Sequence, residues 1–151
     1  MRNEILVLNG PNLNALGRRE PEKYGSVGLA QLETQWKKWG EENALAVRCE
    51  QSNHEGVLLD LLHEAEEGGK VAAVVFNPGA YTHTSRALRD GIASLSIPVI
   101  EVHISNIAER EEWRRHSVVA EVCAGSIAGF GTAGYLLALQ AALVLTGREK
   151  C

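Results

Sequence analysis

Residues 71–76 read Val-Ala-Ala-Val-Val-Phe, an apolar run that is rich in β-branched side chains and carries no polar one. Such a run is typical of a strand that is covered on both faces, as the inner strands of parallel sheets are. Other runs rich in β-branched residues occur before and after it. The sequence therefore predicts five strands, over residues 5–8, 46–49, 71–76, 98–102 and 118–122.

Longer segments with helical spacing separate the predicted strands. Apolar residues recur on one helix face over 29–39 and again over 57–65. Strands that alternate with helices predict an α/β protein with a doubly wound, five-stranded parallel sheet in three layers, either flavodoxin-like or Rossmann-like. A final segment over about 132–146 is apolar nearly all round. We expect a helix of that kind to be buried in the core or in a subunit interface.

Length and charge limit the possible functions. A chain of 151 residues fits a single domain over 1–151. It carries 15 Lys and Arg against 19 Asp and Glu, a net charge of −4, which disfavours nucleic-acid and membrane-surface partners. Three scattered cysteines show neither disulfide nor zinc spacing. We find no secretory signal pattern, so we expect a reduced, cytoplasmic protein without a bound metal.

In open parallel sheets, ligands bind at the carboxyl ends of the strands. The first predicted strand is followed by an unusually long connection that carries Arg18, Arg19 and Tyr24. Long connections at this end of a sheet are commonly lids, and we expect one over about residues 17–25. The alternative is a solvated turn, since Asn, Gly and Pro are ordinary turn residues. That alternative gives no reason for two arginines and a tyrosine at the ligand end.

The fourth predicted strand ends with Glu101 and His103, which are two apart and so point to the same face. A carboxylate beside an imidazole can select its tautomer and orient it. Ile104 and Ser105 come next, directly before an expected helix, where their backbone N–H groups could bind a carboxylate. Asn53 and His54, after the second strand, are explained by helix capping.

The third predicted strand is followed by Asn77 to Ser85, in which a Thr and Ser cluster is placed to cap the next helix. Taken alone, His83 is more typical of a surface histidine than of a catalyst. Neither GxGxxG nor GxxxxGK[ST] occurs, so the dinucleotide and P-loop fingerprints are missing.

Four ordered motifs carry a resemblance to a known family. They are LNGPNLN over 8–14, REPEKYG over 19–25, NPGAYTHTS over 77–85 and IPVIEVHISN over 97–106. With these motifs the chain resembles the type II 3-dehydroquinate dehydratases from residue 5 to about residue 142. The resemblance implies a flavodoxin-like fold. It also implies dehydration of 3-dehydroquinate to 3-dehydroshikimate by anti elimination through an enolate, with no cofactor, in the shikimate or quinate pathway.

The resemblance also implies roles for individual residues. Tyr24 matches the base that removes the C2 proton, and Arg19 matches the lid arginine that supports it. His103 matches the acid that protonates the departing hydroxyl, which leaves Glu101 to orient it. Asn12 matches the asparagine that helps a water to hold the enolate oxygen. The substrate-binding positions matched are Asn77, His83, Ile104, Ser105 and Arg114, and Arg110 matches a further arginine of the active-site region.

The resemblance further implies an assembly. The family forms homododecamers built as tetramers of trimers, and Asp90 matches a carboxylate that reaches the site of a neighbouring subunit.

Two other functions are compatible with such a fold. One is a flavodoxin-like module that binds a small anion or a flavin without turnover. It leaves Tyr24, Arg19 and the Glu101–His103 pair without a common role. The other is a catalytically weakened assembly protein, which is disfavoured because every expected catalytic residue type is present.

Overall fold

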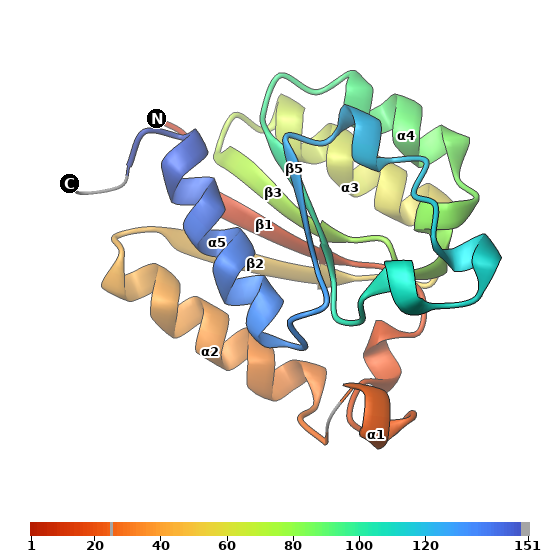
Figure 1. The fold of residues 1–151 in the computed structure, drawn as a ribbon. Helices are drawn as coiled ribbons and strands as arrows, with labels where there is room; N and C mark the ends of the chain where they lie inside the picture. The colour runs from red at the N-terminus through yellow and green to blue at the C-terminus, as the bar shows by residue number, and fades with distance from the viewer. Residues whose placement is uncertain (25, 149–151) are drawn as a thin grey trace.

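The computed structural model describes residues 1–24 and 26–148, and only the backbone at residues 23 and 24. Its centre is a parallel sheet with the strand order β2-β1-β3-β4-β5 (Figure 1). This is the flavodoxin-like order, so the predicted fold class is confirmed. The strands are β1 (Glu4–Asn9), β2 (Ala46–Gln51), β3 (Val71–Asn77), β4 (Val99–His103) and β5 (Gly125–Ala128).

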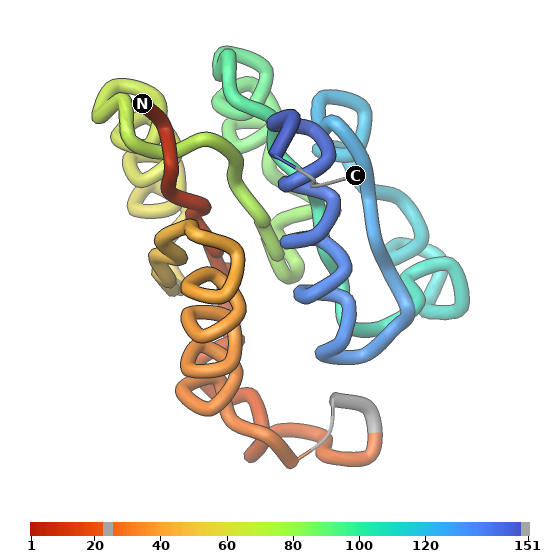
Figure 2. Tube along the Cα trace, turned by 90° about the vertical axis from the view of Figure 1, so that its left-hand side faces the viewer, coloured from red at the N-terminus to blue at the C-terminus, as the bar shows by residue number. Residues whose placement is uncertain are grey.

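Helices cover both faces of the sheet, which gives the three predicted layers (Figures 1 and 2). Side chains alternate along the strands between two cores. Ile5 and Val7 of β1 belong to one core, and Leu6 and Leu8 belong to the other. The first core includes α2 (Leu29–Glu42) and α5 (Ala133–Leu145), and the second includes α3 (Glu55–Glu67) and α4 (Arg86–Ala93).

The fifth strand is not where the sequence predicted it. Residues 118–122 form no strand, and Ala120–Val122 is a short 3-10 helix. Val119 is buried in the core beside α3 and α4, so its β-branched side chain serves packing instead of a sheet. The chain reaches β4 only at Ala124, whose N–H donates to the Val99 carbonyl at 2.8 Å. The true strand, β5, has too few apolar residues to show the periodicity of a buried strand.

The last helix, α5, lies where the sequence predicted it. One side is buried against the sheet, and Tyr135, Ala138 and Leu139 are fully buried. The other side remains apolar and exposed, at Leu136, Leu137, Val144 and Leu145. The expectation of burial in the core is thus met for one side of the helix. Among the described residues, no helix is long and apolar enough to cross a membrane.

The carboxyl ends of β1 and β3 approach each other closely. The Gly10 N–H donates to the Asn77 carbonyl at 2.8 Å. A Cβ at Gly10 would lie 2.5 Å from the Pro78 carbonyl oxygen, so only glycine fits. The connection from β1 to α2 starts here and contains a 3-10 helix (Leu13–Ala15) and α1 (Pro21–Tyr24), which lies beyond the carboxyl end of β1 (Figure 1).

We predict that Gly10→Ala lowers the free energy of unfolding by about 1–3 kcal/mol, because backbone atoms must move to admit the methyl group. Urea unfolding followed by circular dichroism measures this. Gly56→Ala in α3 is the control, because a Cβ there meets no atom within 4 Å, and we expect it to be neutral or stabilising. Equal stability of the two variants would contradict the steric argument.

Candidate active site

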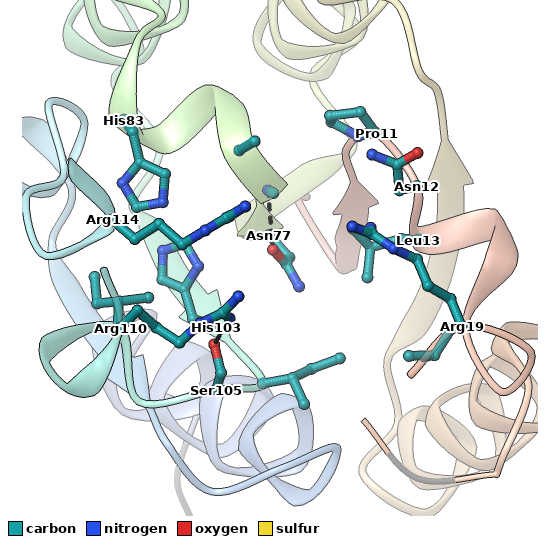
Figure 3. Close-up of a pocket in the computed structure, with 15 residues that line it drawn as sticks. Pro11, Asn12, Leu13, Arg19, Asn77, His83, His103, Ser105, Arg110 and Arg114 are labelled. Atoms are coloured by element: carbon teal, nitrogen blue, oxygen red, sulfur yellow. Dashed lines mark hydrogen bonds between the residues drawn. The ribbon is translucent and has the colours of Figure 1, made fainter. Parts of the chain in front are cut away.

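A pocket opens at the carboxyl ends of β1, β3 and β4, where the fold predicts a ligand site (Figure 3). Asn12 and Arg19 lie on one wall, and His83, His103 and Arg114 lie on the other, with Asn77 between the walls. Most of the predicted site residues are thus brought together. The lining consists of Pro11, Asn12, Leu13, Leu16, Arg19, Asn77, Gly79, Ala80, His83, His103, Ile104, Ser105, Ile107, Arg110 and Arg114.

Glu101 and His103 form a buried pair at the end of β4. The side chains lie on the same face of the strand, as predicted, and His103 Nε2 is 2.7 Å from Glu101 Oε1. A carboxylate can only accept hydrogen bonds, so Nε2 carries a proton. Nδ1 is therefore the ring nitrogen of His103 that remains to exchange a proton with a ligand.

Three hydroxyl groups hold the Glu101 carboxylate from other segments. Thr82 and Ser117 donate to Oε1, Ser117 at 2.7 Å, and Ser126 of β5 donates to Oε2 at 3.0 Å. Burial by itself opposes ionisation of Glu101. The hydrogen bonds from His103, Ser117 and Thr82 outweigh it and hold the carboxyl pKa well below its usual range. Glu101 is thus an ionised acceptor that orients His103.

His83 presents a defined tautomer to the pocket. Its Nδ1 is 2.8 Å from the His116 carbonyl oxygen, which can only accept, so Nδ1 carries the proton. Burial lowers the pKa of His83, and the nearby positive charge of Arg114 lowers it further. The neutral ring therefore offers the Nε2 lone pair as an acceptor for a ligand hydroxyl.

Two arginines line the wall that follows β4. Arg114 Nε is 2.8 Å from Glu111, and its guanidinium lies over the Trp113 ring at 3.9 Å. Arg110 donates to the Ser105 hydroxyl at 3.1 Å. Together with Arg19 on the opposite wall they place three positive charges around the pocket. The site can therefore attract an anion although the chain as a whole is acidic.

Asn12 is held by a residue whose role the sequence did not reveal. Asn12 is in the left-handed region, with φ 69°, and its N–H donates to Asn53 Oδ1 at 3.0 Å. Asn53 and His54 were both expected to cap α3. His54 is the N-cap residue, with its N–H donating to Ser52 Oγ, but Asn53 is not. Asn53 instead supports the loop after β1 across the sheet edge. Only the pairing of β1 with β2 brings the two loops together, so a local pattern could not show it.

The segment after β4 also differs in detail from the prediction. Ile104 and Ser105 do line the pocket. They precede a 3-10 helix of three residues (Ile107–Glu109) instead of a full helix. The macrodipole of so short a helix is small, which weakens the argument that helix position places these two N–H groups for a carboxylate.

Of the predicted site residues whose side chains are described, Glu101 and Asp90 do not line the pocket. Glu101 is buried and is connected to the pocket by its hydrogen bond to His103. Asp90 is exposed on α4, pairs with Arg89 at 3.1 Å, and lines a neighbouring groove. The Tyr24 side chain lies outside the part of the chain that is described, although its backbone ends α1. Among the described residues, no cluster of three or more His, Cys, Asp or Glu side chains could hold a metal ion.

Comparison with known proteins identifies the family. The family described as "Dehydroquinase class II" matches residues 3–143. A 3-dehydroquinate dehydratase of Pelotomaculum thermopropionicum is 54% identical over 144 residues, which are 95% of this chain and 99% of that protein. One of Bacillus pumilus is 58% identical over 136 residues, 90% and 91% of the two chains.

A solved structure gives the same result. The type II dehydroquinase of Butyrivibrio crossotus superposes with a TM-score of 0.91 at 47% identity, over 93% of this chain and 97% of that one. The family match over residues 3–143 includes all five strands and every residue that lines the pocket. The chain therefore belongs to the class II dehydroquinase family.

Proposed function

We propose that this chain is a type II 3-dehydroquinate dehydratase, which converts 3-dehydroquinate to 3-dehydroshikimate and water. The observation that carries the proposal is the buried Glu101–His103 pair facing a pocket with three arginines. The related proteins named 3-dehydroquinate dehydratase support the choice of substrate. The substrate is a polyhydroxylated carboxylate, which matches the mixture of cations, amides and imidazoles that lines the pocket.

The reaction starts with loss of the C2 proton to a base. Tyr24 is the base, and Arg19, on the same connection, stabilises its phenolate. A free tyrosine has a pKa near 10, so ionising it at pH 7 requires about 4 kcal/mol. A guanidinium in a closed, water-poor site is the kind of group that supplies much of this. Residues 17–25 form the lid that would close it.

The C2–H electron pair forms a C2=C3 double bond, and the π electrons of the C3 carbonyl move to its oxygen, which gives an enolate. Asn12 and a water stabilise the negative oxygen. The C3 carbonyl then re-forms, the electron pair of the C2=C3 bond forms a C1=C2 double bond, and the bond from C1 to its hydroxyl breaks. His103 Nδ1 donates the proton that turns the departing hydroxyl into water. Glu101 keeps the imidazole in the required tautomer and compensates its charge while it is protonated.

Substrate binding uses the remaining lining residues. His83 Nε2 accepts from a substrate hydroxyl, and Arg114 and the backbone N–H groups of Ile104 and Ser105 meet the carboxylate or hydroxyl oxygens. Asn77 contributes an amide from the end of β3. These assignments require no cofactor.

The working unit is an assembly of the single domain, 1–151. Asp90 is exposed outside its own pocket, which is compatible with a contact to the site of a neighbouring subunit. The exposed apolar side of α5 is a second candidate contact surface. We propose the family's homododecamer, a tetramer of trimers. It acts in the cytoplasm, in the shikimate pathway or in quinate breakdown, which share this step.

Incubation with 3-dehydroquinate tests the function. Dehydration creates a conjugated enone, so ultraviolet absorbance should rise with time in proportion to the enzyme added. Light scattering in the same buffer reports the assembly. A colourless protein that gives no increase, although assembled and freshly purified, would contradict the proposal. A yellow protein that retains flavin would favour the alternative binding module.

Tyr24→Phe should abolish dehydration while the fold and the assembly are retained, since the change removes only the ionisable oxygen. Steady-state kinetics should show a fall of kcat of about 100- to 10,000-fold, the range typical of general acid–base catalysis. Tyr81→Phe, a change of the same kind on an exposed hydroxyl that donates to the Asn53 carbonyl, is the control and should keep most of the activity. Appreciable activity of Tyr24→Phe would exclude Tyr24 as the base.

Glu101→Gln should lower kcat about 10- to 100-fold, because an amide replaces one charge-assisted hydrogen bond to His103. It should also remove part of the pH dependence of stability. The native carboxyl pKa is lowered, so its contribution is complete above the unfolded pKa, near 4.3, and is lost as pH falls toward the native pKa. Urea unfolding between pH 7 and pH 3.5 measures both proteins. If the free energy of unfolding changed with pH in the same way for the wild type and for Glu101→Gln, Glu101 would not be held as an ion.

A further inference from the structure

Tyr135 of α5 lies under the floor of the pocket and has no part in the mechanism above. It is fully buried, and its ring lies against Trp36 of α2 with a centroid distance of 4.4 Å. Its hydroxyl lies 2.6 Å from Asn9 Oδ1 at the end of β1 and 2.8 Å from Asn77 Nδ2 at the end of β3. One hydroxyl thus joins the ends of the two central strands.

Hydrogen-bond donors and acceptors settle the direction of this chain of contacts. The Gly79 N–H, 3.0 Å from the Asn77 amide, can only donate, so the atom that it meets is the amide oxygen. The other amide atom of Asn77 is then the nitrogen, which donates to the Tyr135 hydroxyl. The single proton of Tyr135 must therefore go to Asn9, whose oxygen accepts it. The directions of all three hydrogen bonds therefore follow from the Gly79 backbone N–H, which can only donate.

We propose that Tyr135 is a positioning residue that orients the Asn77 amide, so that the second N–H of Asn77 donates to an oxygen of the bound substrate. The proposal rests on the proposed function, in which Asn77 binds substrate. In Figure 3 the dashed hydrogen bond of Asn77 ends on its amide oxygen, and the amide nitrogen points away from that bond. Asn77 lines the pocket. Without the Tyr135 hydroxyl, Asn77 Nδ2 loses its buried acceptor and the Asn9 oxygen loses its donor.

A neutral hydroxyl suits this task. Burial raises the pKa of Tyr135 above its ordinary value, so the side chain stays protonated at every working pH. A hydroxyl can accept from one amide and donate to another, which no other side chain of this shape can do. The Tyr135 ring is also held in place, because it projects from α5 into the core formed by α2 and the sheet.

Tyr135→Phe tests the proposal with quinate, a polyhydroxylated cyclohexane carboxylate, as the probe ligand. Isothermal titration calorimetry should show a Kd about 3- to 10-fold weaker than that of the wild type, the loss expected for one hydrogen bond. With 3-dehydroquinate, KM should rise by a similar factor while kcat stays within about twofold, because Asn77 contacts the bound molecule throughout the reaction. An unchanged Kd would overturn the proposal.

A double-mutant comparison separates positioning from general destabilisation. Asn77→Ala alone should weaken quinate binding, and Tyr135→Phe added to it should weaken binding no further. Additive losses would show that Tyr135 acts independently of Asn77 and would overturn the proposal. Val71→Ala is the stability control, because Val71 is buried at the opposite end of β3. It should lower the melting temperature and leave Kd unchanged.

Asn9→Leu decides the question if Tyr135→Phe does not fold. Asn9 Nδ2 is buried and has no hydrogen-bond partner among the described residues, so an apolar side chain of similar size is tolerable there. With no acceptor at Asn9, the Tyr135 hydroxyl competes with the Gly79 N–H for the Asn77 oxygen. This competition disturbs the orientation of the Asn77 amide, so quinate binding should weaken. Because Kd is the readout, a wild type that binds quinate without dehydrating 3-dehydroquinate would contradict the proposed function alone.

Discussion

The site depends on keeping one buried carboxylate ionised. Glu101 is 1% exposed, and an unpaired charge at that depth would cost several kcal/mol. Donors that meet it come from separate parts of the chain, namely Thr82 after β3, Ser117 in the loop before β5, and Ser126 in β5, together with His103 of its own strand. The parallel sheet and its loops must therefore assemble before His103, the proposed acid, is correctly placed.

The rest of the pocket floor follows a different physical rule. At the ends of β1 and β3 the buried polar groups are neutral. Tyr135 is hydrogen-bonded to both Asn9 and Asn77, and Asn9 Nδ2 alone of these groups has no partner among the described residues. Neutral amides can be buried at lower cost than charges when they are paired. The fold thus keeps its buried carboxylate at β4 and uses uncharged groups to shape the surface beside it. Of the arginines, Arg19 is exposed, whereas Arg110 and Arg114 are partly buried and lie beside the Glu111 carboxylate.

Much of this could be predicted from single stretches of sequence. The Glu101–His103 pair follows from period-2 alternation at the end of an apolar strand, and four of the five strands follow from β-branched runs. The prediction failed where packing outweighed local preference. Val119 has the look of a strand residue but fills a core, and β5 is recognised only by its partner β4. Asn53 fits the local pattern of a helix cap. Its contact with Asn12 joins residues 41 positions apart, so no local pattern could predict that contact.

The sequence by itself determined the fold class and the chemical groups present, because alternation and composition are local properties that burial enforces on every strand and helix. It also determined the family, since the motifs are long and ordered. Only the tertiary structure decided which groups meet. The contacts of Asn53 with Asn12, of Tyr135 with Asn9 and Asn77, and of the hydroxyls with Glu101 all join distant segments. Such contacts exist only after the sheet forms, because the strand order, and not the chain order, decides which strand ends are neighbours.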